Sequence, residues 1–289
     1  MRGAYPLTVL CEVLGYARSV LYYEPQGPSE EEAALREAIM RIAGEWPRYG
    51  YRRITAQLQR EGWRVNSKRV RRLLQAMGVH GEQPKKKAPK TTNSRHAYRR
   101  YPNLVRDMRV ERPEQVWVAD ITYIQLADET VYLAIVMDVF TRTIRGWHLS
   151  RHLDQALTLK ALQRALQEGT PEIHHSDQGV QYAAHAYVQT LAAHGVAISM
   201  ADVGASWQNG YAERVIRTIK EEAVALSEYR DYHDAYQQLG HFIDQVYRHK
   251  RIHSALGYLT PAEFEAQWRA KHASLKNVFN TNSDFRVQI

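Results

Sequence analysis

Three acidic side chains stand at places where strand ends and a helix are expected to meet. Asp120 interrupts the largely apolar run WVADITY, Asp177 lies in HHSDQG, and Glu213 lies in NGYAER, with 35 residues between the last two acids. A carboxylate on an otherwise apolar strand needs a cationic partner or a metal ion. Carboxylate oxygens are also the ligands that Mg²⁺ prefers. We therefore take these three acids as the candidates for chemistry.

The predicted order of elements brings the three acids toward one another. Residues 115–125 and 143–149 alternate between two faces and residues 131–140 are almost wholly apolar, which predicts an antiparallel meander. Further predicted elements are a helix at 154–168, a strand at 171–176, a helix at 181–194, a strand at 196–199, a long helix from 209 past 225, and helices at 231–249 and 261–271. We predict an α/β fold with a five-stranded mixed sheet and helices on both faces. Asp120 then lies on the first strand, Asp177 at the end of the fourth, and Glu213 on the long helix.

The first third of the chain has the charge of a region that binds a polyanion. Residues 1–100 contain 20 Lys and Arg against 9 Asp and Glu, whereas residues 101–289 contain 19 against 22. The excess behind the net charge of +8 therefore lies entirely in the first third. A solvated surface usually interleaves both signs, so this bias favours a nucleic-acid partner over a merely soluble surface.

Two short predicted helices in this basic region are typical of a helix-turn-helix at about 49–79. They span 52–60 and 68–77 and are joined by a turn that contains Gly62. The basic residues of the second helix stand off its apolar stripe, as in a recognition helix that enters a major groove. A basic surface helix without a ligand is the alternative. The candidate DNA contacts here are Arg52, Arg53, Lys68, Arg69, Arg71 and Arg72.

A basic linker is expected to separate the two parts. Residues 81–100 lack apolar periodicity and contain Lys85, Lys86 and Lys87, which could follow a phosphate backbone. The predicted organisation is a helical N-terminal region at 1–80, the linker at 81–100, the α/β core at 101–228, and a C-terminal helical region at 229–289.

Composition excludes several classes of protein. The single cysteine, Cys11, excludes a disulfide framework and a zinc finger of the Cys-Cys-His-His type. No apolar run approaches the roughly 20 residues of a membrane span. We expect a cytoplasmic protein with no membrane partner.

The settings of the three acids, with the basic helix-turn-helix and the run from Tyr247 to Pro261, resemble the DDE transposases of the retroviral-integrase superfamily. They are most similar to the second-frame proteins of the insertion-sequence-three family of bacterial elements, over most of the chain. The resemblance implies an RNase H-like core with Asp120, Asp177 and Glu213 as catalytic residues and metal ligands.

The chain departs from the usual pattern of that family at two places. Gln208-Asn209-Gly210 stands where Asp-Asn-Ala is frequent, and Arg248 follows Tyr247 where asparagine is usual. Neither place holds one of the three acids. The departures therefore bear on DNA contacts or subgroup and not on the chemistry.

The resemblance implies a polynucleotidyl transferase with two Mg²⁺ ions, for which Mn²⁺ can substitute. Two ions roughly 3.5–4 Å apart would activate the attacking oxygen and stabilise the leaving 3′-oxygen of a phosphodiester. The attacking oxygen belongs to water in nicking and to a DNA 3′-hydroxyl in strand transfer. No protein nucleophile is required.

The same resemblance implies the partners. These are double-stranded DNA (the terminal inverted repeats and the target), further copies of the chain in a multimer on DNA, and an upstream helix-turn-helix protein or a frameshift fusion with it, in association with the nucleoid. Arg217 and Lys220 follow Glu213 at i+4 and i+7 and could hold phosphates, although an ordinary salt-bridged face is the alternative. Asn209 and Arg251 complete the expected DNA contacts.

Several alternatives stay open at this point. Asp138 fits a structural acid better than an auxiliary ligand, and His174 with His175 lack the further spaced ligands of a metal site. Trp207 fits a base-stacking side chain and a hydrophobic plug equally well. At the level of function, the rivals are a non-catalytic DNA-binding remnant or regulator of transposition, and a nuclease acting on RNA–DNA hybrids.

Overall fold

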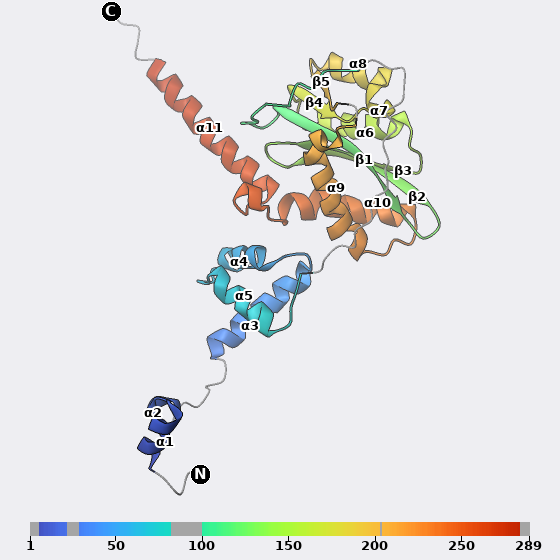
Figure 1. Ribbon diagram of the computed structural model, residues 1–289. Coiled ribbons are helices and arrows are strands. Elements are labelled where there is room, and N and C mark those ends of the chain that lie inside the picture. The colour runs from blue at the N-terminus through green and yellow to red at the C-terminus, as the bar shows by residue number, and fades with distance from the viewer. Residues whose placement is uncertain (1–5, 22–28, 82–99, 203, 284–289) are drawn as a thin grey trace, which may run out of the picture. The chain divides into compact units, whose positions relative to one another are not determined.

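The chain divides into two compact units, residues 1–81 and residues 82–289 (Figure 1). The computed structural model describes residues 6–21, 29–81, 100–202 and 204–283. The predicted linker lysines Lys85, Lys86 and Lys87 lie outside the described residues. Each unit is described below by itself.

The first unit is helical, as its sequence predicts. Its helices are α1 (Leu7–Leu14), α2 (Arg18–Leu21), α3 (Glu30–Glu45), α4 (Tyr51–Arg60) and α5 (Ser67–Ala76). The side chains of Ser29 and Asn66 cap α3 and α5 by accepting backbone N–H groups of the first turn. Buried apolar residues of α3, α4 and α5 form the core of this part, among them Leu35, Ile39, Ile54, Leu58, Val70 and Leu73.

The second unit is built on a five-stranded mixed sheet in the order β3-β2-β1-β4-β5. Its strands are β1 (Val116–Gln125), β2 (Thr130–Asp138), β3 (Ile144–Ser150), β4 (Ile173–Ser176) and β5 (Ala197–Met200). The first three strands form the predicted antiparallel meander, and β4 pairs in parallel with both β1 and β5. The predicted fold class is confirmed: this is an RNase H-like sheet with helices on both faces.

Each face of the sheet carries its own hydrophobic core because successive side chains of β1 point to opposite sides. Val116, Val118 and Ile124 pack with α9 (Gly210–Glu222), α10 (Tyr232–His241) and the π-helical turn η3 (Phe242–Tyr247). Trp117 and Ala119 pack on the other face. That face is covered by α6 (Gln155–Leu166), α7 (Val180–Ala183) and α8 (His185–Ala193).

Two helices depart from the sequence prediction. The single helix expected at 181–194 is broken at Ala184, whose ψ of 141° is extended, into α7 and α8. The helix expected to run past Ala225 ends at Glu222 and continues as the short 3-10 turn η2 (Val224–Leu226). Leu226 in this turn is 42% exposed.

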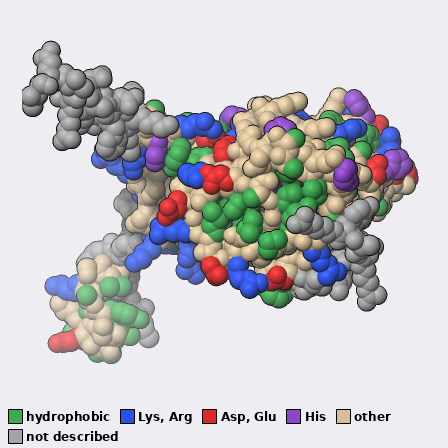
Figure 2. All heavy atoms as spheres, turned by 90° about the horizontal axis from the view of Figure 1, so that it is seen from above, with side chains coloured by type: hydrophobic (Ala, Val, Ile, Leu, Met, Phe, Trp, Pro, Cys, Tyr) green, Lys and Arg blue, Asp and Glu red, His purple; other side chains and the backbone are tan. Residues whose placement is uncertain are grey.

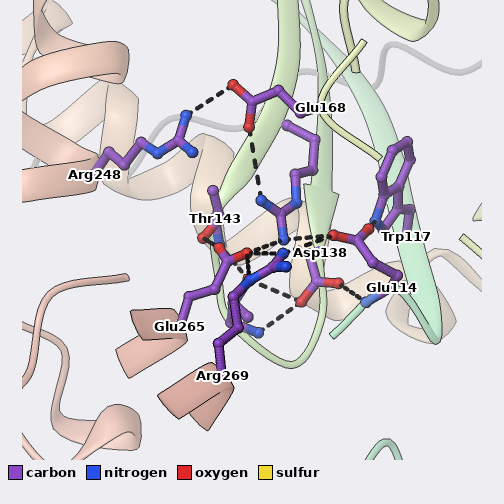
Figure 3. A network of polar contacts seen from close by, with 10 residues as sticks. Glu114, Trp117, Asp138, Thr143, Glu168, Arg248, Glu265 and Arg269 are labelled. Carbon is purple, nitrogen blue, oxygen red and sulfur yellow. Dashed lines mark hydrogen bonds and ion pairs between the residues drawn. The ribbon is translucent and has the colours of Figure 1, made fainter. Parts of the chain in front are cut away.

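A buried polar network fastens the C-terminal helix α11 (Pro261–Ser283) to the sheet (Figure 3). The guanidinium of Arg145 on β3 lies 2.7 Å from Glu114 and 2.9 Å from Glu265 of α11. Glu114 also accepts the indole N–H of Trp117, and Glu265 contacts Arg269 at 2.6 Å. A remaining 3-10 turn, η4 (Ser254–Leu256), precedes α11.

The surface carries several exposed hydrophobic side chains. Figure 2 shows one face of the molecule, where hydrophobic side chains gather among Lys, Arg, Asp and Glu side chains. The exposed aromatic side chains include Trp207, which is 72% exposed, and Tyr211, which is 50% exposed. Within the described ranges, no helix has the length and apolar character needed to cross a membrane.

Candidate active site

Strand register brings the first two acids together. In the parallel pair β1–β4, Ala119 lies opposite Ser176. Asp120 and Asp177 are the next residues after this pair. Their backbones therefore lie side by side, Asp120 in the middle of β1 and Asp177 just past the end of β4. This juxtaposition comes from backbone pairing alone.

The third acid lies on α9. The 3-10 turn η1 (Ser206–Asn209) leads into this helix, and Glu213 lies in its first turn with an exposed side chain. The side-chain amide of Asn209 donates to the carbonyl oxygen of Ala119 at 2.9 Å, one residue before Asp120. This hydrogen bond fixes the start of α9 against β1.

The negative charges of Asp177 and Glu213 both act on Asp120. Asp120 keeps a partly accessible surface, yet protein atoms surround its carboxylate closely. Burial, with smaller contributions from the negative charges of Asp177 and Glu213, raises the pKa of Asp120 to about 8. The N–H of Ile121, which donates to Asp120 at 2.8 Å, and the charge of Lys220 oppose this shift. Negative charge at the site is thus only partly compensated by the protein.

Local hydrogen bonds orient Asp177. The backbone N–H of Gly179 donates to Asp177 Oδ1 at 2.9 Å, which closes a tight turn between β4 and α7. A Cβ atom at Gly179 would lie 3.0 Å from the same oxygen. Glycine thus lets the turn approach the acid closely.

The donor set fits a hard divalent cation such as Mg²⁺. It consists of carboxylate oxygens around an under-compensated charge. Next to them the side-chain oxygen of Asn209 is buried and has no hydrogen-bond partner among the described residues. In the part of the chain that the structure describes, no three His, Cys, Asp or Glu side chains are already gathered closely enough to form a finished metal cage.

Two cations line the helix that carries Glu213. Lys220 is half-buried, and its ammonium lies 4.4 Å from the centre of the Tyr123 ring. Burial lowers the pKa of Lys220, and the nearby charge of Asp120 opposes that shift. Arg217 is exposed one turn after Glu213. Both placements leave a phosphate-holding role open.

Two further predicted DNA contacts are not available at the surface. Asn209 is only 2% exposed and is held by Ala119, so the structure gives it a positioning role. Arg251 is 3% exposed and forms two hydrogen bonds of 2.6 Å with the carboxylate of Glu222 at the end of α9. Both expectations failed because sequence spacing does not reveal which polar side chain is enclosed.

The remaining polar candidates near the sheet are structural. Asp138 accepts N–H groups of Glu114 and Thr141 in the buried network of Figure 3. His174 contacts the hydroxyl of Tyr187 at 2.9 Å, and His175 contacts that of Ser199 at 2.8 Å. Burial lowers the pKa of His174 to about 3 and that of His175 to about 4, which keeps both rings neutral.

The basic candidates of the first unit lie on α4 and α5. The side chains of Arg52, Lys68, Arg71 and Arg72 are exposed, while Arg53 and Arg69 are partly exposed. The guanidinium groups of Arg52 and Arg71 lie over the ring of Tyr51 at 5.3 and 5.7 Å. Arg69 contacts Glu31 at 3.1 Å and Arg72 approaches Glu32 at 3.9 Å. The helix-turn-helix thus presents an exposed basic surface.

Sequence reasoning missed the residues that hold α9 in place. The ion pair of Glu222 with Arg251 joins positions 29 residues apart, and neither residue carries a local signal of that contact. The exposure of Trp207, in contrast, decides between the two readings of that side chain: it is no hydrophobic plug.

The sheet, the acids and the helix-turn-helix define a DNA-processing protein with an integrase-type core. Residues 110–206 and residues 194–261 match two family models described as integrase core domain, and residues 29–87 match an HTH-like domain. The chain is 34% identical to the transposase for insertion sequence element IS629 of Shigella sonnei, over 96% of each chain. It is 33% identical to the transposase for IS904 of Lactococcus lactis subsp. lactis strain IL1403, over 85% of this chain and 98% of that one.

The chain therefore belongs to the integrase-core transposases of insertion sequences, members of the retroviral-integrase superfamily. Among solved structures it is similar to the catalytic core domain of HTLV-2 integrase in complex with magnesium, with a TM-score of 0.42 and 14% identity over 53% of this chain and 97% of that chain. The family acts in DNA transposition and integration, a polynucleotidyl transfer.

Proposed function

We propose that this transposase cuts and joins DNA at one site made of Asp120, Asp177 and Glu213. The single observation that carries the proposal is the neighbourhood of three acids from separate elements. Register places Asp120 beside Asp177, and the charges of both Asp177 and Glu213 act on Asp120.

The chemistry is a nucleophilic substitution at phosphorus, which is hydrolysis when water attacks and transesterification when a DNA 3′-hydroxyl attacks. The attacking oxygen forms a new bond to phosphorus, the bond to the old 3′-oxygen breaks, the proton of the nucleophile passes to solvent, and the leaving 3′-oxygen takes up a proton to become a 3′-hydroxyl. The three carboxylates would hold Mg²⁺ ions, which when bound activate the nucleophile and stabilise the leaving oxygen. Lys220 and Arg217 would hold the phosphates of the strand beside Glu213.

The proposed partner is double-stranded DNA, bound at the element ends through the basic surface of α4 and α5. Cutting two ends in one reaction requires at least two copies of the core, so we propose a multimer on DNA. Arg52, Arg53, Lys68, Arg69, Arg71 and Arg72 are the proposed contacts of this unit.

A joining assay tests the proposal. The substrate is a labelled duplex that carries the terminal repeat flanking this gene, incubated with a target duplex and Mg²⁺, Mn²⁺ or EDTA. We expect joined product with either metal and none with EDTA. Asp177→Asn should abolish joining while it leaves DNA binding intact.

Asp128→Asn is the matched control, because Asp128 is exposed in the turn between β1 and β2. It should join DNA as the unaltered protein does. Binding without nicking in the unaltered protein, even with the upstream partner protein added, would instead establish a non-catalytic DNA-binding protein. Activity on RNA–DNA hybrids alone would establish a nuclease.

A further inference from the structure

Tyr182 carries a hydroxyl group that the fold encloses without using it. The residue lies in α7 and is 2% exposed, and its hydroxyl oxygen has no hydrogen-bond partner among the described residues. A buried polar group without a partner destabilises a fold, whereas a phenylalanine side chain has nearly the same shape and avoids that cost. The packing of the core therefore gives no reason for a tyrosine at this position.

The neighbouring tyrosine shows the ordinary arrangement of a buried hydroxyl. Tyr187 on α8 is fully buried, and the centre of its ring lies 5.4 Å from that of Tyr182. Its hydroxyl forms a hydrogen bond of 2.9 Å with Nε2 of His174. The ring of His174 is also close to that of Tyr182, at 6.4 Å between centres, but its Nε2 is already engaged by Tyr187.

The turn after β4 places Tyr182 beside the acids. The N–H of Tyr182 donates to the carbonyl oxygen of Gly179 at 3.0 Å, and the N–H of Gly179 donates to Asp177 Oδ1 at 2.9 Å. A Cβ atom at Gly179 would lie 3.0 Å from that oxygen and 3.5 Å from Cδ2 of Tyr182. The carboxylate of Asp177 and the edge of the ring thus flank the same point. Tyr182 also packs in the core that contains Ala119, the residue before Asp120.

The charges around the hydroxyl group keep its proton in place. Burial, with smaller contributions that include the negative charges of Asp120 and Asp177, raises the pKa of Tyr182 well above its ordinary value. An ionised carboxylate can only accept hydrogen bonds, and a protonated tyrosine can donate one. An enclosed donor therefore stands next to two acceptors that the proposed function assigns to metal.

We propose that Tyr182 is a positioning residue of the acid site. Its hydroxyl donates a hydrogen bond to the carboxylate of Asp120, directly or through one bound water, when the acids hold metal. The N–H of Ile121 already donates to one oxygen of Asp120, and carboxylates that bind metal are commonly oriented by such hydrogen bonds. Tyr182 keeps its proton throughout and acts through Asp120. The inference rests on the proposed function, since it assigns a support for the same site.

Tyr182→Phe tests the inference, because it removes only the hydroxyl group. Binding of Mn²⁺ to the full chain with a DNA duplex end is followed through the paramagnetic resonance of free Mn²⁺. We expect this variant to bind Mn²⁺ about tenfold more weakly than the unaltered protein. Tyr187→Phe is the matched control, because it removes a buried hydroxyl from the same core, and it should bind Mn²⁺ as the unaltered protein does.

Thermal unfolding in EDTA separates positioning from a contribution to the fold. Tyr182→Phe removes a hydroxyl without a partner, so it should melt at the same temperature as the unaltered protein or roughly 2–4 °C higher. Tyr187→Phe leaves the enclosed ring of His174 without its partner and should melt at a lower temperature. The two variants should therefore show opposite patterns in the two measurements.

The same titration on Asp177→Asn separates failure of this inference from failure of the proposed function. Weakened Mn²⁺ binding in Asp177→Asn beside unchanged binding in Tyr182→Phe would overturn this inference alone. A lower melting temperature of Tyr182→Phe in EDTA would also overturn it, because the hydroxyl would then serve the fold. If Asp177→Asn binds Mn²⁺ as the unaltered protein does, the proposed metal site fails and this inference fails with it.

Discussion

At the scale of single residues, ionisation of Asp120 costs free energy that a bound metal ion would offset. Its carboxylate is enclosed beside two further acids, which raises its pKa to about 8. Ionisable groups with strongly shifted pKa values are typical of functional sites, where side chains serve chemistry and not stability. The protein therefore gives up folding free energy at the position where its chemistry is proposed.

Asp120→Asn should stabilise the metal-free protein in a pH-dependent way. The folded pKa of about 8 lies above the ordinary value of 3.8 for an aspartate, so the unfolded chain ionises first and the folded state loses stability as pH rises between these values. Thermal unfolding should show little difference between the variant and the unaltered protein near pH 4. At pH 8 the variant should melt higher by roughly 3–8 °C.

Added Mg²⁺ should reduce the difference in melting temperature between Asp120→Asn and the unaltered protein, because it stabilises only the unaltered protein. A gap that is the same at pH 4 and pH 8, or Asp120→Asn melting lower throughout, would contradict the charge argument. Asp128→Asn, with its exposed carboxylate, serves as the control for loss of an acid.

At the scale of elements, the ion pair of Arg251 with Glu222 clamps the end of the helix that carries Glu213. Both side chains are enclosed, and two hydrogen bonds of 2.6 Å join them. Arg251→Ala would leave a carboxylate enclosed without its main partner. We expect a loss of about 3–5 kcal/mol in the free energy of unfolding of the second unit, with loss of DNA joining.

Arg251→Lys keeps the positive charge but lacks the paired N–H groups of arginine. Its free energy of unfolding should lie between those of the unaltered protein and Arg251→Ala. The matched control is Arg248→Ala, whose pair with Glu168 is partly exposed and should contribute about 0–1 kcal/mol. Chemical denaturation measures both. If Arg251→Ala unfolds at the same denaturant concentration as Arg248→Ala, the ion pair of Arg251 with Glu222 does not stabilise the second unit.

Close packing of α6 on β3 depends on Gly146. A Cβ atom there would lie 2.2 Å from the carbonyl oxygen of Ala161, so alanine forces the helix away from the sheet. Gly146→Ala should cost about 1–3 kcal/mol or more of unfolding free energy. Gly210→Ala meets nothing within 4 Å and should be nearly neutral in the same denaturation experiment.

The sequence predicts the elements that have a clear periodicity, but it does not predict helix breaks and ion pairs that depend on tertiary contacts. Alternation in β1 correctly separated the two faces, because each face is buried by different helices. The break at Ala184 has no local signal, since alanine favours helix, and it arises where Tyr182 and Tyr187 pack around His174. Arg251 was predicted to contact DNA because the sequence carries no signal of its ion pair with Glu222.

At the scale of the whole molecule, the largest excess of positive charge and the three acids lie in different stretches of the sequence. The first 100 residues carry 20 Lys and Arg, while the three acids lie between residues 120 and 213. Affinity for DNA and the joining reaction should therefore be separable by substitution. DNA binding should depend on salt through the first unit.

Lys68→Ala and Arg71→Ala should each weaken DNA binding and lower the slope of log K against log salt by about 1, the loss of roughly one phosphate contact. Both side chains are exposed on α5. Arg36→Ala is the control, because Arg36 pairs with Glu32 at 2.7 Å within α3. An unchanged slope in both test variants would place the DNA contact elsewhere.

A Mn²⁺ titration shows whether the three acids from separate elements bind metal as one site. The paramagnetic resonance of free Mn²⁺ is followed as it is added to the full chain with a DNA duplex end, for the unaltered protein, Asp120→Asn, Asp177→Asn, Glu213→Gln and Asp128→Asn. We predict that the three site variants each weaken Mn²⁺ binding by about tenfold or more while Asp128→Asn binds as the unaltered protein does. Mn²⁺ binding that is the same in all five proteins would contradict the claim.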